Sequence, residues 1–301
     1  MSADRAFYIA SATKPFVAAT TISLVEDGVL GLDDPLGKYV DFPHSTGVTL
    51  RHLLSMRSGI PDYTQAYGFT NRVEEDLLRR RTRHWSTAEL LDIAASANPE
   101  FAPGGRFAYS NTNYILLGEV IRAATGKTWD EVLQERVLDP LGLERTLLPT
   151  DGNEPVVAAG HTDLDRDANR DSLAGRPYTT VVTAAGPAGG LVSTAEDLTA
   201  FAHGVFGGSL LAETTLEAMT RVERIGYERE YGLGVSVHQP DLRTRTIGHT
   251  GAGIGYSSVL WYAPEHDVAI AVLVNDSVAE PEDLAELLLR QVLRQPARKS
   301  E

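Results

Sequence analysis

Residues 256–275, YSSVLWYAPEHDVAIAVLVN, carry two runs of β-branched and aromatic residues separated by a short stretch that contains Pro264. Runs of this kind, bounded by Gly, Pro or Asn, are typical of antiparallel strands joined by hairpins. Two similar runs precede them, YGLGVSVH at 231–238 and TRTIGHTG at 244–251. The C-terminal part of the chain therefore predicts an antiparallel sheet.

Helical patterns dominate the rest of the chain. Residues 16–27, FVAATTISLVED, place apolar residues at helical spacing and are followed by Gly28, a plausible stop. Residues 151–180 are rich in Asp, Asn, Gly and Pro and predict loops. The fold class expected is α+β, an antiparallel sheet flanked by helices with a helix-rich middle. Further helices are predicted at 49–57, 74–83, 113–125, 128–138, 194–206 and 281–294.

The bulk composition limits the partners of the chain. It has 301 residues, a formal net charge of -14 and no cysteine. The negative charge disfavours nucleic acid and anionic membranes, and the missing cysteines exclude disulfides, thiolate chemistry and cysteine-ligated zinc. The arginine run within 74–83 is interpreted as a solvated helix face rather than a binding patch, because Glu75 lies four residues before Arg79.

The sequence as written is expected to have neither a membrane span nor an N-terminal signal peptide. No apolar run approaches the length of a membrane span, and the first residues lack the basic and apolar regions of a signal peptide. The chain as written is predicted to be cytoplasmic, and periplasmic or secreted if the N-terminus is truncated.

Ser11 and Lys14 lie three residues apart in YIASATKPF, residues 8–16, where a helix is expected to begin. On a helix they share a face, so the Lys14 amine could reach the Ser11 hydroxyl. Burial can lower the pKa of a lysine enough for it to accept a proton, and a helix start supplies N–H groups for an oxyanion. The alternative is a capping serine beside a surface lysine, and such a pair is expected roughly once by chance in a chain of this length.

Tyr109, Ser110 and Asn111 follow a Pro-Gly-Gly turn and precede the predicted helix at 113–125. A loop tyrosine near a lysine is a credible proton shuttle, and Asn111 offers an acceptor and donors for a substrate amide. Alone, the triplet is better explained as a packed tyrosine with Asn111 as a helix cap.

His249, Thr250 and Gly251 end one predicted strand and begin a glycine-rich stretch. Glycine allows a substrate backbone to approach the strand edge, and the other two residues supply donors toward a substrate carboxylate or carbonyl. The backbone N–H of Ala252 could join that of Ser11 in an oxyanion hole. The alternative is a hairpin with a satisfied histidine. The run GAGIG follows no strand–helix unit and is not favoured as a nucleotide loop.

Together the three motifs follow the order of the set Ser-x-x-Lys, Ser-Asp-Asn and Lys-Thr-Gly of serine β-lactamases and penicillin-binding proteins, with Tyr-Ser-Asn as the second element and His-Thr-Gly as the third. The chain resembles the serine β-lactamase-like family over nearly its whole length. Within it, the chain is similar to the branch of class C β-lactamases, D-alanyl-D-alanine carboxypeptidases, D-aminopeptidases and esterases. Further segments carry the resemblance: LRHLLSMRSGIPDY, PGGRFAYSNTNYILLGEVI, AAGPAGGLVSTAEDL and YGLGVSVH.

The resemblance implies a fold and a set of roles. It implies an α/β domain at 1–48 and 186–301 and a mainly helical inserted domain at 49–185 that carries Tyr109, Ser110 and Asn111, with a catalytic cleft between the two. By this likeness Ser11 is the acylated nucleophile, Lys14 and Tyr109 share the proton transfers, and Asn111, His249, Thr250 and Gly251 bind substrate. The partner expected is a small molecule or peptide with an amide or ester bond, and no cofactor or metal is expected.

The sequence departs from the family in two places. Family members carry a longer segment, including sheet strands, before the Ser-x-x-Lys helix, so the strand near 268–274 is expected to show an open edge that favours aggregation. Related carboxypeptidases have a hydroxyl residue after His-Thr-Gly and an arginine on the preceding strand, where this chain has Ala252 and Ser236. Arg243 or Arg245 could compensate.

The function expected is an acyl-enzyme serine hydrolase on Ser11, similar to a D-alanyl-D-alanine carboxypeptidase or an esterase. The alternatives are a β-lactamase or D-aminopeptidase, or a penicillin-recognising scaffold without useful turnover. A different hydrolase mechanism is disfavoured, because the chain has neither Gly-x-Ser-x-Gly nor a His-x-x-x-His pair. The sequence does not determine the oligomeric state.

Overall fold

The sheet predicted from the C-terminal part is present in the computed structural model, which describes residues 5–150, 153, 155–164, 170–222, 230–238 and 244–294. Five antiparallel strands lie in the order β5-β6-β7-β8-β9, so strands that follow one another in sequence are neighbours. A hairpin at 254–255 joins β7 to β8 and pairs His249 with Leu260. The strands are β5 (Glu230–Tyr231), β6 (Ser236–His238), β7 (Thr246–Gly253), β8 (Tyr256–Ala263) and β9 (Val268–Val274).

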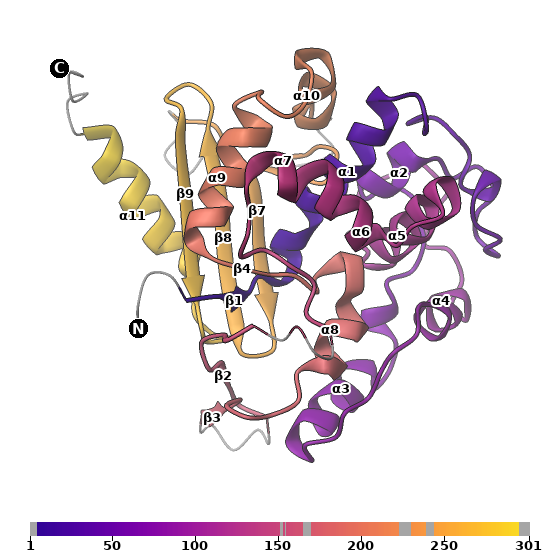
Figure 1. The fold of residues 1–301 in the computed structure, drawn as a ribbon. Helices are drawn as coiled ribbons and strands as arrows, with labels where there is room; N and C mark the ends of the chain where they lie inside the picture. The colour runs from indigo at the N-terminus through magenta and orange to yellow at the C-terminus, as the bar shows by residue number, and fades with distance from the viewer. Residues whose placement is uncertain are drawn as a thin grey trace.

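Strand β8 is buried along its whole length because helices cover both faces of the sheet. Val259 and Trp261 pack with α11 (Pro281–Arg294) on one face, through Ala285 and Leu289. The alternate residues of β8 face the main core, which includes α1 (Lys14–Glu26) and α9 (Ala195–Phe206). Figure 1 shows α11 beside β9 at one flank of the sheet. The period of two along a strand produces this division of the core.

Helix α1 crosses the centre of the molecule, between the sheet and the other helices (Figure 1). Ten of its thirteen residues are buried, and the Phe16 ring stacks on Phe201 of α9 with 3.7 Å between centroids. A helix that is apolar on all sides is one that is covered on all sides. The 3-10 turn η1 (Ala10–Thr13) precedes α1 and carries Ser11.

The helical part of the molecule packs around α5 (Thr112–Thr125), which contacts α1, α2, α4 and α6. Gly126 ends α5 in the left-handed conformation, with φ of 75°. The other helices before residue 150 are α2 (Leu50–Leu54), α3 (Phe69–Leu78), α4 (Thr87–Ala95), α6 (Trp129–Leu133), the π-helical turn Gln134–Leu138 and α7 (Asp139–Leu141), with 3-10 turns η2 (Leu36–Lys38) and η3 (Tyr63–Gln65).

Short elements between residues 155 and 222 connect the helices back to the sheet. Strand β1 (Phe7–Tyr8) pairs with β4 (Val192–Ser193), which holds the chain just before Ser11. The remaining elements are β2 (His161–Thr162), β3 (Asp171–Ser172), α8 (Thr179–Ala185), η5 (Gly186–Ala188) and α10 (Glu213–Thr220).

The predicted fold class is confirmed, and several element boundaries differ from the prediction. The helix predicted at 74–83 runs from Phe69 to Leu78, because its buried stripe is Phe69, Val73 and Leu77. It stops there because Arg80 adopts a left-handed conformation, with φ of 54°. The predicted ion pair between Glu75 and Arg79 is present at 2.7 Å.

Two other predicted segments are more divided than expected. The run 231–238 is split by a turn at 232–235 into the ends of β5 and β6. Residues 151–180, predicted as loops, also contain β2, β3 and the start of α8 where they are described. The division into domains at 1–48 with 186–301 and at 49–185 stays a prediction.

Strand β9 lies at the end of the strand order, as the open edge predicted near 268–274 requires. Beyond its last residue, Asn275 and Ser277 exchange hydrogen bonds with the segment before β2 and with His161. Within the described part of the chain, no helix is both long and apolar enough to span a membrane.

Candidate active site

Lys14 is fully buried, and its amine lies within hydrogen-bonding distance of three oxygen atoms. Nζ is 3.1 Å from the Ser11 Oγ, 2.8 Å from the Asn111 Oδ1 and 2.6 Å from the carbonyl oxygen of Ala188. Burial lowers the pKa of Lys14 to about 7, and the charge of Asp62 opposes that shift. The predicted contact between Ser11 and Lys14 is present, and the surface-lysine alternative does not hold.

These three contacts decide what a neutral Lys14 can do. The amide oxygen of Asn111 and the carbonyl of Ala188 can only accept, so the two hydrogens of a neutral amine are directed to them. The lone pair of Nζ then faces Ser11. A neutral amine held in this way can accept the hydroxyl proton of Ser11.

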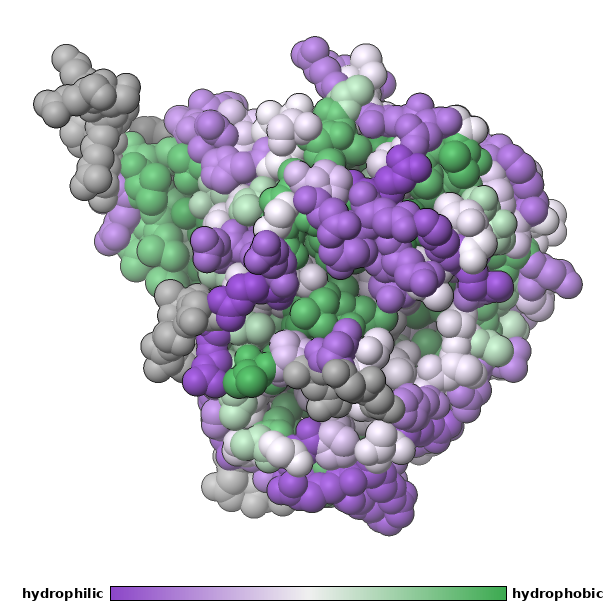
Figure 2. Space-filling model, viewed as in Figure 1, coloured by the Kyte–Doolittle hydropathy of each residue, from purple (hydrophilic) through white to green (hydrophobic). Residues whose placement is uncertain are grey.

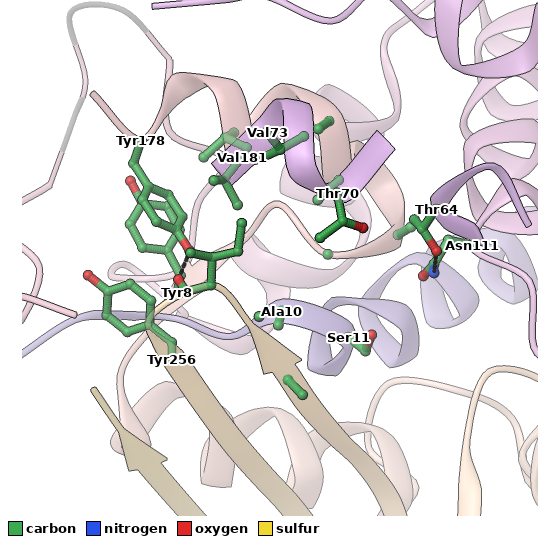
Figure 3. A pocket seen from close by; sticks show the side chains of 18 of the residues that line it. Tyr8, Ala10, Ser11, Thr64, Thr70, Val73, Asn111, Tyr178, Val181 and Tyr256 are labelled. Carbon is green, nitrogen blue, oxygen red and sulfur yellow. Dashed lines mark hydrogen bonds between the residues drawn. The ribbon is translucent and has the colours of Figure 1, made fainter. Parts of the chain in front are cut away.

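Ser11 lies between two proton-carrying groups. The Tyr109 hydroxyl donates to Ser11 Oγ at 2.9 Å, and Lys14 Nζ lies 4.8 Å from the centroid of the Tyr109 ring. Figure 3 shows the Ser11 side chain at the edge of the cavity, below Thr64 and Asn111. Ser11, Lys14 and Tyr109 therefore form one hydrogen-bonded cluster.

The backbone before Ser11 is strained. Ala10 has φ of 47°, a left-handed value that costs a non-glycine residue about 1–2 kcal/mol. This conformation ends the extended segment of β1 and begins the 3-10 turn that carries Ser11. Gly189 and Gly253 lie close to Ala10, since a Cβ on Gly253 would be 3.2 Å from the Ala10 Cβ. Strained residues of this kind cluster at functional sites.

Asn111 does not act as the helix cap considered above. It occupies the position before α5, but its side chain makes no capping hydrogen bond. Its Oδ1 accepts from Lys14, and its Nδ2 donates to Asp62 Oδ2 at 3.0 Å, with Thr64 Oγ1 at 3.4 Å. The carbonyl of Ala188 and the carboxylate of Asp62 were not among the predicted site residues. The only signal for Asp62 was its place in the recognised segment that ends in SGIPDY.

His249 lies behind Tyr109 rather than on the cavity wall. It is 5% exposed, and its ring centroid is 6.2 Å from that of Tyr109. Nε2 lies 3.1 Å from the Tyr231 hydroxyl, and Nδ1 lies 2.5 Å from the carbonyl oxygen of Thr250. Because a carbonyl only accepts, Nδ1 carries a proton, and Nε2 shares a hydrogen bond with the Tyr231 hydroxyl. Both ring nitrogens of His249 thus have hydrogen-bonding partners within the protein, as in the predicted alternative of a hairpin with a satisfied histidine.

The glycine of the third motif is required by the chain itself. A Cβ on Gly251 would lie 2.2 Å from the carbonyl oxygen of Ile9 and 2.3 Å from Ser258 Oγ. The Ser258 hydroxyl donates to that carbonyl at 2.8 Å. Gly251 thus lets β7 approach the backbone that leads into Ser11. The predicted approach of a substrate backbone at this glycine stays a prediction.

The residues considered for a substrate carboxylate are engaged elsewhere. The Ser236 hydroxyl lies 3.1 Å from the carbonyl oxygen of Gly248 and 2.8 Å from His238 Nε2. The Arg245 guanidinium donates to the carbonyl of Thr220 at 2.8 Å. Arg243 lies outside the described residues.

A cavity of about 270 Å³ opens beside Ser11. Ser11, Asn111 and Thr64 lie at one end in Figure 3, and Tyr8, Tyr178 and Tyr256 lie at the other. Ala252, the predicted second oxyanion donor, lines the same cavity as Ser11. None of its described lining residues carries a charged side chain. The apolar part of the lining includes Tyr8, Phe69, Val73, Tyr178, Val181 and Ile254.

Aromatic contacts fix the far end of the cavity. The rings of Tyr8 and Tyr178 lie 3.9 Å apart, and Tyr256 meets both edge to face. The Tyr178 hydroxyl donates to the carbonyl of Ile254, and the Tyr256 hydroxyl donates to that of Ala158. Because both hydroxyls are used, the surface that the rings of Tyr178 and Tyr256 present to the cavity is mainly carbon.

Comparison with known proteins shows the family that the chain matches. A family model described as Beta-lactamase matches residues 1–294. Penicillin-binding protein 4* of Bacillus subtilis (strain 168) is 26% identical over 89% of this chain, which spans 60% of that protein's length.

Solved structures show the same fold. A D-stereospecific amidohydrolase from Streptomyces sp. superposes with a TM-score of 0.85 at 28% identity, over 94% of this chain and 85% of its own. The D-amino acid amidase from Ochrobactrum anthropi SV3 superposes with a TM-score of 0.84 at 25% identity, over 98% of this chain and 87% of its own.

Proposed function

Since the chain belongs to the β-lactamase family, a family of serine hydrolases, we propose that it hydrolyses a small, neutral ester or amide through an acyl-enzyme on Ser11. One observation carries the proposal. A buried lysine whose pKa is about 7 contacts Ser11 at one end of a cavity that no described charged side chain lines.

Acylation follows from the contacts of Lys14. The Ser11 oxygen attacks the substrate carbonyl carbon as its proton passes to the neutral Lys14 amine. The ammonium that forms donates to Asn111 and Ala188, which already accept from Nζ, so no group has to move. Tyr109 then protonates the departing oxygen or nitrogen, and the phenolate that remains takes the proton held by the Lys14 ammonium, which lies beside the Tyr109 ring.

Deacylation uses the same groups in reverse. Water adds to the acyl carbon, Tyr109 and Lys14 take its proton, and the proton returns to Ser11 as the acid leaves. The oxyanion of both steps is assigned to the backbone N–H groups of Ser11 and Ala252, an assignment supported by their place on the same cavity.

The cavity favours a substrate without a carboxylate near the reacting bond. A buried carboxylate needs a cation or several donors, and Arg245, the candidate described here, is bound to Thr220. The apolar lining instead fits an aliphatic or aromatic group. The volume of about 270 Å³ lies just below the usual range for small-molecule sites, so the group is small. The amidohydrolase and amidase among the similar structures support including amides.

The test compares three substrate classes at one enzyme concentration. We expect turnover of p-nitrophenyl butyrate or N-acetyl-D-phenylalanine amide, both uncharged, to exceed that of an N-acylated peptide ending in D-alanyl-D-alanine. Ser11→Ala should abolish turnover, whereas Ser96→Ala, an exposed serine at the end of α4, should not.

Two results would contradict the proposal. Preferred cleavage of the D-alanyl-D-alanine peptide would overturn the substrate class. Equal turnover by Ser11→Ala and the unmodified chain would overturn the nucleophile. A stable acyl adduct on Ser11 by intact mass, with no more than one leaving group released per enzyme molecule, would instead favour the scaffold alternative.

A further inference from the structure

Asp62 is a buried carboxylate beside the catalytic cluster, and it takes no part in the proposed proton transfers among Ser11, Lys14 and Tyr109. It is 9% exposed, and it forms no ion pair with any residue in the described ranges. Its Oδ1 accepts from the backbone N–H of Thr64 at 3.0 Å, and its Oδ2 accepts from Asn111 Nδ2 at 3.0 Å. A buried charge with so few partners is costly unless the site uses it.

The chain holds Asp62 in place from both sides. The Thr112 hydroxyl donates to the carbonyl of Pro61 at 2.6 Å and accepts from the N–H of Tyr63 at 3.0 Å. The Tyr63 hydroxyl donates to the carbonyl of Ala184 at 2.5 Å. Thr112 directly follows Asn111. The two hydrogen bonds of its hydroxyl therefore hold the residues on either side of Asp62 against the start of α5, next to Asn111.

The carboxylate decides which way the Asn111 amide faces. With Nδ2 donating to Asp62, Oδ1 is left to accept from Lys14. In the reversed orientation the amide nitrogen would face the donors of Lys14, and the amide oxygen would face the carboxylate. Both contacts would be repulsive.

We propose that Asp62 is a positioning residue of the hydrolytic site, which fixes the Asn111 amide so that Oδ1 holds Lys14 beside Ser11. The inference rests on the proposed function for its effect on rate. Its structural part, the coupling of Asp62 to Lys14 through Asn111, can be measured without turnover.

The charges around Lys14 support a measurable effect. Desolvation in the fully buried site lowers the pKa of Lys14, and Asp62, the residue before η3, raises it. The other groups that face Nζ are the rings of Tyr109, before α5, and Tyr114, in α5, at 4.8 and 5.4 Å from their centroids. Asp62 is thus the one described anion that acts on Lys14, and its removal should make the ammonium less stable.

The test titrates Lys14 directly by NMR. The chain has four lysines, so ¹³C labels at lysine Cε give a few resonances, and Lys14→Arg identifies the one from Lys14. We expect the pKa of Lys14 to fall in Asp62→Asn and to stay near that of the unmodified chain in Asp62→Glu. Asp76→Asn is the matched control, because Asp76 on α3 is also 9% exposed.

The kinetic arm measures kcat/KM against pH for the same variants. Asp62→Asn should move the acidic limb of the kcat/KM profile to lower pH, because the pKa of Lys14 falls. It should also reduce the plateau value of kcat/KM at least tenfold, because the Asn111 amide is no longer fixed. Asp62→Glu should keep the limb and recover part of the plateau. Circular dichroism and the melting temperature establish that each variant is folded, and Asp62→Ala replaces Asp62→Asn if it is not.

The outcomes separate the two proposals. An unmoved Lys14 titration in folded Asp62→Asn, or an equal shift in Asp76→Asn, overturns the role of Asp62. A shifted titration with Ser11→Ala as active as the unmodified chain overturns the proposed function and leaves the coupling intact.

Discussion

At the cleft the side chain of Lys14 is fully buried, whereas on α11 the side chain of Leu287 is 52% exposed. The amine of Lys14 has three hydrogen-bonding partners from three separate parts of the chain. The neighbours of Leu287 on the same face of α11, Leu284, Leu288 and Val292, are also partly exposed. Figure 2 shows this region as a continuous hydrophobic area at the place that α11 occupies in Figure 1.

The exposure of these apolar side chains follows from the spacing of apolar residues along α11. Ala285 and Leu289, four residues apart, lie against the sheet, and Leu284 and Leu288 form a parallel stripe next to them. The apolar face of this helix is therefore wider than the surface that the sheet offers it. Within the described residues, the amine of Lys14 is completely covered, whereas the outer stripe of α11 has no covering element. Burial is thus complete at the candidate site's amine and incomplete on the helix that packs against the sheet.

Removing the Lys14 side chain should have the largest effect on kcat/KM. We expect Lys14→Ala to lower kcat/KM by about 10³-fold or more, because the residue that accepts the Ser11 proton is lost. Lys38→Ala serves as the control, since the Lys38 side chain is 53% exposed. Comparable losses in both variants would show that the defect is not specific to the buried amine.

The pH dependence of the unmodified chain should report the same residue. Below about pH 7 the Lys14 amine is protonated and cannot accept the Ser11 proton. We expect kcat/KM to fall roughly tenfold for each pH unit below that value and to level off above it. A profile that is flat from pH 5 to 8, on protein shown to be folded at both ends, would contradict this assignment.

Gly251→Ala should damage the junction between the sheet and the catalytic turn. The added Cβ would meet the Ile9 carbonyl at 2.2 Å, so β7 has to move away from the turn that carries Ser11. We expect a loss of about 1–3 kcal/mol in the free energy of unfolding, together with lower activity. Denaturant unfolding measures the first, and Gly37→Ala, where the nearest atom is 3.6 Å away, provides the control.

Polar substitutions on α11 should produce the smallest effect. Leu287→Lys and Leu288→Lys are expected to change the free energy of unfolding by less than about 0.5 kcal/mol and to reduce light scattering as the protein is concentrated. Leu289→Lys, one position further and only 2% exposed, should be strongly destabilising. If all three variants lose the same stability, the outer face of α11 is covered in solution.

The sequence predicted most of the elements and the centre of the site. The strands β7, β8 and β9 and the helices α1, α5, α9 and α11 follow from local periodicity and were placed to within a few residues. The helix α4 was missed although its capping box, Ser86 with Glu89, was readable as Ser-x-x-Glu. The end of α3 was misplaced because the arginines after Leu78 suit a helix by propensity, while the fold turns the chain at Arg80.

Local spacing by itself determined that Ser11 and Lys14 would meet, since three residues on a helical turn bring any two such side chains together. Only the tertiary structure made Lys14 suited to the proposed role of base. Its lowered pKa comes from burial, and its orientation comes from Asn111, Ala188 and Asp62, which lie 97, 174 and 48 residues away in sequence. Burial and long-range hydrogen bonds depend on how the elements pack, and no local pattern contains that information.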